Sequence, residues 1–365
     1  MKSYRVLCLT DQSDLPETEL FIRLKKAGVD IEVACNPKGR NFARINDSDV
    51  SVHELTAVSR FSPKSIQKIR KILNQQNYDI LYCFNNKAAS NLLLATRGEK
   101  KYKIITYRGT VGNISFLSPA SWTTHLNPRV SRIVCVSEAV RRHLISMRFL
   151  GLKISPERAV TIYKGHDPAW YQSRPIDLPG EFNIPDNAFV VGFAGRNRPH
   201  KGIDYLIGAT RYLPADEDIH FLLLGRLAGD KLLQKKIAQS PYKNRIHLAG
   251  FRDDAPAVFA ACDAFVMPST KREGLSRAVI EAMVQATPPI VTNVGGLPEL
   301  VLHNQSGIVV PPEDAGAIAR AILKLFTDPE GKKLLGVNAR QRIEDHFHID
   351  QTVEHTRSLF ESLIN

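Results

Sequence analysis

The sequence predicts two doubly wound α/β domains in series, each built on a parallel sheet. Short apolar runs alternate with amphipathic stretches, the alternation occurs twice, and a proline-rich segment at 166–187 separates the two series. At 365 residues the chain is also too long for one typical domain. Open α/β sheets bind ligands at the carboxyl ends of their strands, so we expect an interdomain cleft there.

The first series contains strands and helices in alternation. Ser62 and Pro63 mark a helix start, and Ile66, Ile69 and Leu73 form the apolar stripe of that helix. We expect strands at 4–9, 29–34, 79–84, 102–107, 131–136 and 159–163, and helices near 15–27, 63–76, 87–97 and 137–149.

The second series repeats this pattern, with strands expected at 189–194, 219–224, 245–249, 263–268, 288–293 and 307–310 and helices near 202–213, 229–240, 277–286, 313–327 and 331–346. A last amphipathic stretch near 350–364 has no strand after it. We therefore expect an N-terminal domain over 1–168, a linker over 169–187 and a C-terminal domain over 188–349. The final helix, 350–365, is expected to pack back on the first domain.

Composition indicates a globular protein with reduced thiols. Five cysteines are scattered in apolar segments without CxxC spacing, which argues against a disulfide framework. No leader pattern precedes the first strand, and no apolar run reaches the roughly 18 residues of a membrane span. We expect a cytoplasmic protein, either free or peripheral on the inner face of the cell membrane. No pattern indicates an oligomeric state.

The net charge of +12 is unevenly placed, because Lys and Arg outnumber Asp and Glu only in residues 1–180. Such asymmetry indicates an anionic partner, either nucleic acid or an acidic membrane. No nucleic-acid module is present, so we expect no nucleic acid and favour the membrane. Leu144–Leu152 is typical of an interfacial helix, and the long loop 109–130 carries apolar groups suited to a lipid or sugar acceptor: Phe116, Leu117 and Trp122. A soluble basic surface with a soluble acceptor is the alternative.

The segment from Gly192 to Gly202 leaves one predicted strand and enters the next helix. Such a turn offers backbone N–H groups at the positive end of a helix, which suits an anion. Arg196 and Lys201 add two cations to the same turn, as a diphosphate site requires. The glycines satisfy neither the GxGxxG nor the GxxxxGKS/T pattern, so the turn alone also fits a solvated basic loop.

A second segment, residues 273–283, follows another predicted strand. Ser276 is a suitable N-cap, so Gly274 to Arg277 would present further N–H groups. Glu273 precedes this helix and Glu281 lies on its second turn, so one carboxylate can face a sugar and the other a ribose. Taken alone, two glutamates also fit solvated helix charges.

Together these segments resemble a known family. GRxxxxKG around Arg196 and Lys201, ExxxxxxxE from Glu273 to Glu281, and GGLPE at 295–299 are similar to the retaining GT-B glycosyltransferases of glycosyltransferase family 4, also called glycosyl transferases group 1. The likeness is dense over 189–327 and looser over 1–165. There TYRGT at 106–110, CVSEAV at 135–140 and YKGHD at 163–167 occupy similar places.

The resemblance implies a GT-B hexosyltransferase that uses a nucleotide-diphosphate sugar as donor substrate and has no other cofactor. It implies catalytic roles for Arg196 and Lys201 on the donor diphosphate and for Glu273 on the transferred sugar. Glu281 is implied to bind the ribose. The remaining donor contacts are implied for Gly274, Leu275 and Ser276 at the phosphate and sugar and for Gly250, Phe251 and Arg252 near the base.

The charges predict a metal-independent mechanism. Cations and amides stabilise the departing diphosphate, and the leaving phosphate accepts the acceptor's proton. The family likeness implies retention of configuration. Asp47-Ser48-Asp49 spells DxD, a metal motif of another transferase fold, but it lacks a suitable strand context and we interpret it as a turn.

Three departures concern the acceptor side. Arg108 stands where the family commonly has a His, Thr10–Asp14 replaces a glycine-rich loop, and Lys164 occupies a position often held by Asn. Arg cannot act as a neutral base, so Arg108 has either an electrostatic or acceptor-binding role or a structural one. We expect a glycan or lipid-linked acceptor in bacterial surface polysaccharide or lipopolysaccharide synthesis. A sugar-nucleotide epimerase or hydrolase, and a non-catalytic nucleotide-sugar binder, are the alternatives.

Overall fold

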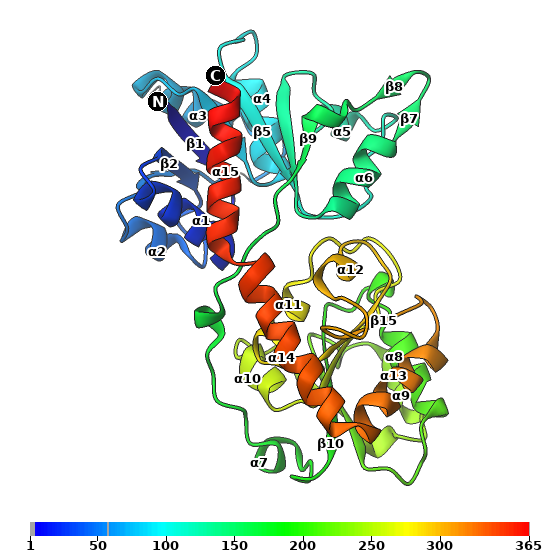
Figure 1. Ribbon diagram of the computed structural model, residues 1–365. Helices are drawn as coiled ribbons and strands as arrows, with labels where there is room; N and C mark the ends of the chain where they lie inside the picture. Colours follow the sequence, from blue (N-terminus) through cyan, green and yellow to red (C-terminus); the bar gives the residue numbers. More distant parts are fainter. Residues whose placement is uncertain (1–3, 57, 365) are drawn as a thin grey trace. The chain divides into compact units, whose positions relative to one another are not determined.

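The computed structural model describes residues 4–56 and 58–364, which form two compact units (Figure 1). The first unit contains residues up to Gly165 together with the C-terminal segment from Ile349, and the second contains His166–His348. The segment 169–187, expected as a linker, belongs to the second unit and carries a 3₁₀ turn at Pro168–Tyr171 and the helix α7 at Leu178–Phe182. No helix in the described ranges is both long and apolar enough to cross a bilayer.

The first unit is built on a seven-stranded sheet whose pairings are all parallel, in the order β3-β2-β1-β4-β5-β6-β9. Its elements are β1 Arg5–Leu9, α1 Leu15–Lys26, β2 Asp30–Cys35, α2 Phe42–Asn46, β3 Ser51–Glu54, α3 Pro63–Gln75, β4 Ile80–Cys83, α4 Asn86–Ala95, β5 Lys103–Arg108, α5 Pro119–Trp122, β6 Val130–Cys135, α6 Glu138–Ser146, β7 Arg148–Phe149, β8 Leu152–Lys153, β9 Ala159–Thr161 and α15 Ile349–Ile364.

The C-terminal helix α15 packs against α1 within this unit (Figure 1). Phe360 of α15 meets Tyr82 of β4 edge to face, with ring centroids 6.2 Å apart. Thr352 of the same helix accepts a hydrogen bond from the amide of Gly165 and donates one to the carbonyl of Tyr163, both at 2.8 Å. The end of the chain therefore completes the core of the first unit.

The second unit contains a six-stranded parallel sheet in the order β12-β11-β10-β13-β14-β15. Its helices form two packed groups, one with α8 against α13 and one with α10, α11 and α14. The elements are β10 Phe189–Ala194, α8 Ile203–Ala209, β11 Ile219–Leu224, α9 Lys231–Ala238, β12 Ile246–Gly250, α10 Ala255–Ala260, β13 Ala264–Met267, α11 Arg277–Val284, β14 Pro289–Thr292, α12 Leu297–Leu300, β15 Ile308–Val310, α13 Ala315–Thr327 and α14 Pro329–His346. Its central strands β10 and β11 are apolar and almost wholly buried, as expected for a sheet covered on both faces.

The interfacial helix expected over Leu144–Leu152 is wrong. Helix α6 ends at Ser146, and the chain then forms a two-stranded antiparallel hairpin from β7 and β8. The reason is local, because Leu150 and Gly151 both have positive φ values, 45° and 80°, and two such residues turn the chain back on itself. The loop 109–130 contains the short helix α5, and Asp47–Asp49 forms the expected turn.

Candidate functional site

The predicted donor residues lie at one place in the second sheet. Chain order runs outward from β10 to β11 and β12 on one side and from β13 to β15 on the other, so the order reverses between β10 and β13. The loops that follow these two strands leave the carboxyl edge of the sheet at this reversal point. Open α/β sheets bind their ligands there. The loop after β10 carries Arg196 and Lys201, and the loop after β13 carries Glu273.

Two glycines allow these loops to pack closely. A β-carbon on Gly202, which has φ +70°, would lie 1.8 Å from the carbonyl oxygen of Pro268. One on Gly295, with φ +56°, would lie 2.0 Å from the carbonyl oxygen of Glu273. Any side chain at either position would push the loops apart. The glycines of the GRxxxxKG and GGLPE patterns therefore hold Lys201 and Glu273 in register with each other.

Lys201 and Glu273 form a partly buried ion pair. The lysine Nζ lies 3.0 Å from each carboxylate oxygen, and Ser269 Oγ donates to Oε2 at 2.8 Å. Glu273 is buried, so its negative charge needs these partners. The structure thus brings together the cation expected at the diphosphate and the carboxylate expected at the sugar.

Glu281 lies on α11 and is also buried. Its carboxylate contacts Arg277 one turn earlier, with Nε and Oε1 2.6 Å apart. Burial raises the pKa of Glu281, while Arg277 acts in the opposite direction. Sequence reasoning did not assign a role to the Arg277 side chain, although its spacing of four residues from Glu281 is the usual signal of a helical ion pair.

A pocket of about 630 Å³ opens inside the second unit, lined by the loops after β10, β11 and β12 and by α11, and Lys201 and Glu273 are not among its lining residues. Arg196, Arg198 and Arg226 line it, and the structure gives none of the three an acidic partner within the described ranges. Glu281 and Phe251 line the same pocket. A pocket with several unneutralised guanidinium groups beside a carboxylate suits a polyanion that also carries hydroxyl groups. Arg198 and Arg226 are further pocket residues that sequence reasoning did not select.

The start of α11 is open to a ligand. Ser276 has the extended backbone of an N-cap, but within the described residues its side chain makes no capping hydrogen bond. Gly274 and Leu275 precede it in the loop that carries Glu273. The expected N-cap position is therefore found, and the cap bond is not.

The residues expected at the base differ in their availability. Gly250 ends β12, and the Phe251 side chain is 63% exposed at the pocket. Arg252 contacts both oxygens of Asp254 at 2.7 Å and Glu181 at 2.6 Å. These hydrogen bonds, led by those to Asp254, raise the pKa of Arg252. Its guanidinium is thus already neutralised, and it fixes the loop.

In the first unit Arg108 ends β5 and is buried. One terminal nitrogen donates to the carbonyl of Gly112, and Nε has no hydrogen-bond partner among the residues the structure describes. Burial lowers the pKa of Arg108. Nearby, His125 lies between Thr106 and Asn86 at 3.0 Å each, and burial followed by Arg108 lowers its pKa to about 3. His125 is therefore a neutral histidine that positions the end of β5, and sequence reasoning missed it.

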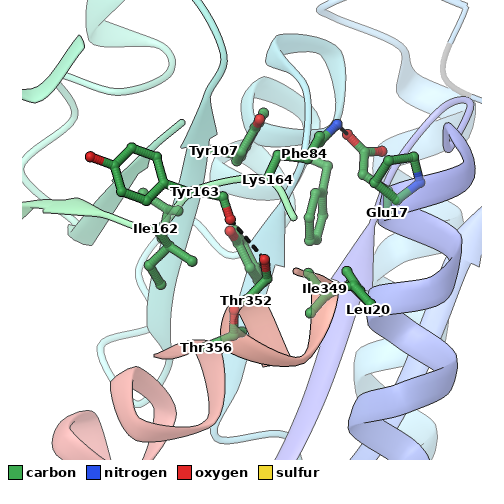
Figure 2. Close-up of a pocket in the computed structure, with 13 residues that line it drawn as sticks. Glu17, Leu20, Phe84, Tyr107, Ile162, Tyr163, Lys164, Ile349, Thr352 and Thr356 are labelled. Atoms are coloured by element: carbon green, nitrogen blue, oxygen red, sulfur yellow. Dashed lines mark hydrogen bonds and ion pairs between the residues drawn. The ribbon is translucent and has the colours of Figure 1, made fainter. Parts of the chain in front are cut away.

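Two of the departures noted in the sequence meet at one place, and Figure 2 shows the Lys164, Glu17 and Tyr107 side chains there. Lys164 Nζ lies 2.8 Å from Asp14 and 3.0 Å from Glu17 at the start of α1, and over the ring of Tyr107. Asp14 also caps α1 by accepting from the Glu17 amide at 3.0 Å. Burial raises the pKa of Glu17 to about 7, although Lys164 opposes the shift. The lysine that replaces Asn and the acidic loop that replaces glycines therefore form one ion-pair network.

Within the described ranges, no group of three or more His, Cys, Asp or Glu side chains is placed to hold a metal ion. The five cysteines are all buried and free.

The family comparisons agree with this geometry. The model for Glycosyltransferase Family 4 matches residues 18–170, and the model for Glycosyl transferases group 1 matches residues 177–342. The two matches together span most of the chain, so the chain belongs to glycosyltransferase family 4.

Individual relatives extend the match. An uncharacterized glycosyltransferase of Methanocaldococcus jannaschii is 30% identical over 64% of this chain and 60% of its own length. The UDP-Gal:alpha-D-GlcNAc-diphosphoundecaprenol alpha-1,3-galactosyltransferase of Escherichia coli is 24% identical over 94% of this chain and 92% of its own length. HepE of Anabaena, solved in complex with UDP, superposes with a TM-score of 0.78 at 24% identity over 98% of this chain and 100% of that one. The structural likeness confirms the GT-B fold.

Proposed function

We propose that this protein is a retaining hexosyltransferase. It transfers a sugar from a nucleotide-diphosphate donor to a glycan or lipid-linked acceptor in bacterial surface polysaccharide or lipopolysaccharide synthesis. The observation that carries the proposal is the pocket in which Arg196, Arg198 and Arg226 lie beside the buried Glu281, with no carboxylate partner among the residues that the structure describes. The Escherichia coli relative, a galactosyltransferase that uses UDP-Gal and a diphosphoundecaprenol acceptor, supports a UDP-sugar donor and a lipid diphosphate acceptor.

The donor is assigned to the second unit. Arg196 and Lys201 bind its diphosphate together with the amides of Gly274 to Ser276, which lie where a helix start favours phosphate. Glu281 accepts hydrogen bonds from the ribose, and Phe251 and the backbone at Gly250 meet the base. Glu273 remains bonded to Lys201 and accepts from hydroxyls of the transferred sugar.

The chemical step follows from these charges. Breaking the anomeric C–O bond leaves the electron pair on the nucleoside diphosphate, and positive charge develops on the sugar. Lys201 and Arg196 stabilise the departing phosphate oxygen, and Glu273 lies on the side of the cationic sugar. The acceptor hydroxyl forms the new bond on the same face, and its proton passes to the leaving phosphate, so configuration is retained.

The first unit is assigned to the acceptor and to an anionic membrane surface on the cytoplasmic side. Arg108 supports this assignment, because its buried guanidinium has an Nε without a partner in the described part of the chain, and such a group favours a negatively charged ligand nearby. The basic excess of residues 1–180 supports contact with acidic lipids.

The donor site is tested with Arg196→Ala and a control, Arg211→Ala, which removes another exposed arginine of the second unit. We expect Arg196→Ala to lower kcat about 100-fold, the effect of losing one transition-state donor, and Arg211→Ala to leave it within about twofold. UDP-, GDP- and ADP-sugars in a thermal-shift screen identify the donor, since a ligand of the native state raises Tm. Equal activity of Arg196→Ala and wild type would contradict the assignment.

The same assay separates the alternatives. Donor turnover without any acceptor favours the epimerase or hydrolase, and donor binding without turnover across acceptors favours the binder.

Metal independence is a separate prediction. Because Lys201, Arg196 and amides carry the phosphate charge in this mechanism, excess EDTA should leave the transfer rate unchanged. A loss of rate that Mg²⁺ or Mn²⁺ restores would show that the donor diphosphate requires a cation.

A further inference from the structure

The hairpin formed by β7 and β8 has an unusual tip. Phe149 pairs with Leu152 across the strands, so Leu150 and Gly151 form a two-residue turn, and both have positive φ. Turns of this kind strongly prefer Asn or Asp followed by Gly, because a bulky side chain strains the left-handed conformation. Leu150 is also 89% exposed, the highest value among the exposed large apolar residues. In the isolated protein, Leu150 therefore carries two free-energy costs: its side chain strains the backbone of the turn, and its apolar surface is exposed to water.

The strands below the tip carry a second unfavourable feature. Arg148 pairs directly with Lys153, and like charges opposite each other destabilise an antiparallel pair. Arg148 donates to the carbonyl groups of Ile145 and Met147, and neither cation has an acidic partner within the described part of the chain. Leu152 beside the tip is 42% exposed.

We propose that this hairpin is a membrane-docking element that places Leu150 in the acyl boundary of an anionic bilayer. The flanking cations, Arg148 and Lys153, contact the lipid phosphates. An apolar tip on a cationic base is the arrangement of interfacial segments, which combine buried apolar area with attraction to anionic lipids. The bilayer removes two of the three costs, since it covers the leucine and neutralises the opposed cations, and the strained turn remains as the means of presenting the leucine at the tip.

A bilayer fits this element better than a macromolecular partner does. A stable protein interface buries about 800 Å² on each side, far more than one leucine at the tip of a two-residue turn can supply. Single-stranded nucleic acid is bound by stacking on aromatic side chains, and the exposed tip offers an aliphatic one. This docking element rests on the proposed function, because a lipid-linked acceptor requires the enzyme to be at the bilayer.

The test is co-sedimentation of the full chain with vesicles of phosphatidylglycerol and phosphatidylcholine, compared with phosphatidylcholine alone. Leu150→Asn supplies the residue that the turn prefers while removing the apolar tip, so the hairpin is preserved. We expect it to lower binding to the acidic vesicles about tenfold, as for loss of most of one leucine's burial. The matched control is Leu232→Asn on α9, a leucine that is 73% exposed beside Lys231 in the second unit. That control should bind as wild type does.

A charge variant tests the other half of the proposal. Arg148→Glu turns the like-charge pair with Lys153 into an attractive one, so the hairpin itself is stabilised. Binding to acidic vesicles should nevertheless fall at least tenfold, since each Lys or Arg near an anionic surface contributes about fivefold. Binding of wild type to phosphatidylcholine alone should be weak.

Four results would overturn the proposal: wild type that does not bind acidic vesicles, equal binding to neutral ones, equal loss in Leu150→Asn and Leu232→Asn, or a concentration-dependent dimer that Leu150→Asn abolishes. UDP affinity, measured by calorimetry on the same proteins, separates this from the proposed function. Loss of vesicle binding with UDP affinity intact concerns the hairpin alone. Absence of UDP binding in wild type contradicts the donor site and leaves the hairpin result to stand.

Discussion

The two sheets share one strand order around their reversal points, yet the loops that leave their first strands carry opposite charge. After β1 the chain places Asp14 and Glu17 at the start of α1 and pairs both with Lys164. After β10 it places Arg196 and Arg198 beside a pocket, without acidic partners in the described ranges. The same position in the fold is thus filled by the protein's own ions in one unit and open to an outside anion in the other. The fold supplies the place, and the side chains decide its use.

The space around the two lysines shows the same contrast. The cavity beside Lys164 holds about 20 Å³, which is room for one water molecule, and apolar groups such as Leu20 and Ile349 line it (Figure 2). The pocket beside the loop that carries Lys201 holds about 630 Å³. Lys164 and Lys201 both pair with a buried glutamate, but Lys164 lines only the small cavity, whereas Lys201 follows Arg196 and Arg198, which line the large pocket, in the same loop. We therefore expect one pair to serve stability and the other to serve stability and catalysis.

Replacing each lysine by methionine gives the largest expected effects. Lys164→Met leaves Glu17 buried without its cation, and Lys201→Met does the same to Glu273, so each should lose about 3 kcal/mol of unfolding free energy. Only Lys201→Met should also lower kcat, by about 100-fold, because only it removes a group at the leaving phosphate. Urea unfolding and steady-state kinetics on both variants provide the measurement.

The comparison fails if the kinetic effects are equal. A 100-fold loss of kcat in Lys164→Met, with UDP affinity unchanged, would place the first lysine in the chemistry. Arg211→Ala is again the control for general surface charge.

The stability of wild type should depend on pH in a way that the stability of Glu17→Gln does not. Its pKa is about 7 in the folded protein against an ordinary value of 4.5, so the folded state holds the proton more tightly than the unfolded state. The resulting stabilisation is complete below pH 4.5 and is lost as pH rises through 7. Relative to Glu17→Gln, wild type should therefore lose up to about 3 kcal/mol between pH 4.5 and pH 8. Chemical unfolding of both proteins across that range tests the sign, and a constant difference would refute it.

Much of the fold was predictable from the sequence, and the elements that were missed have physical reasons. The expected helices and strands correspond to the observed elements of both sheets, because the apolar periodicity of parallel α/β units is strong. The short strand β3 at Ser51–Glu54 and the hairpin β7–β8 were missed, since neither has a long apolar run. A helix was predicted over this stretch because it is amphipathic. The turn was missed because Leu150 stands where a turn of this kind usually has Asn or Asp.

The residues of the site also fall into those that the sequence predicted and those that it did not. Arg196, Lys201, Glu273 and Glu281 were selected from motifs, and the structure places them around the loops of one sheet edge. Arg198, Arg226 and His125 carry no motif and become visible only when loops from distant strands meet. The ion pairs of Lys164 and Arg252 were equally hidden, because a charged residue in sequence does not reveal whether a partner already neutralises it.

The smallest effect concerns two serines in the same helix position. Ser137 begins α6 in the first unit and its hydroxyl accepts from the Val140 amide at 3.3 Å, whereas Ser276 begins α11 in the second unit and makes no such bond. Ser137→Ala should cost about 1 kcal/mol of unfolding free energy, and Ser276→Ala less than about 0.5 kcal/mol, since only the first loses a cap. Thermal unfolding of both variants without ligand tests this. If Ser276→Ala costs as much as Ser137→Ala, the α11 amides are already capped and have little to offer a phosphate. A smaller loss of unfolding free energy in Ser276→Ala would mean that the amides at the start of α11 are free to bind an anionic ligand.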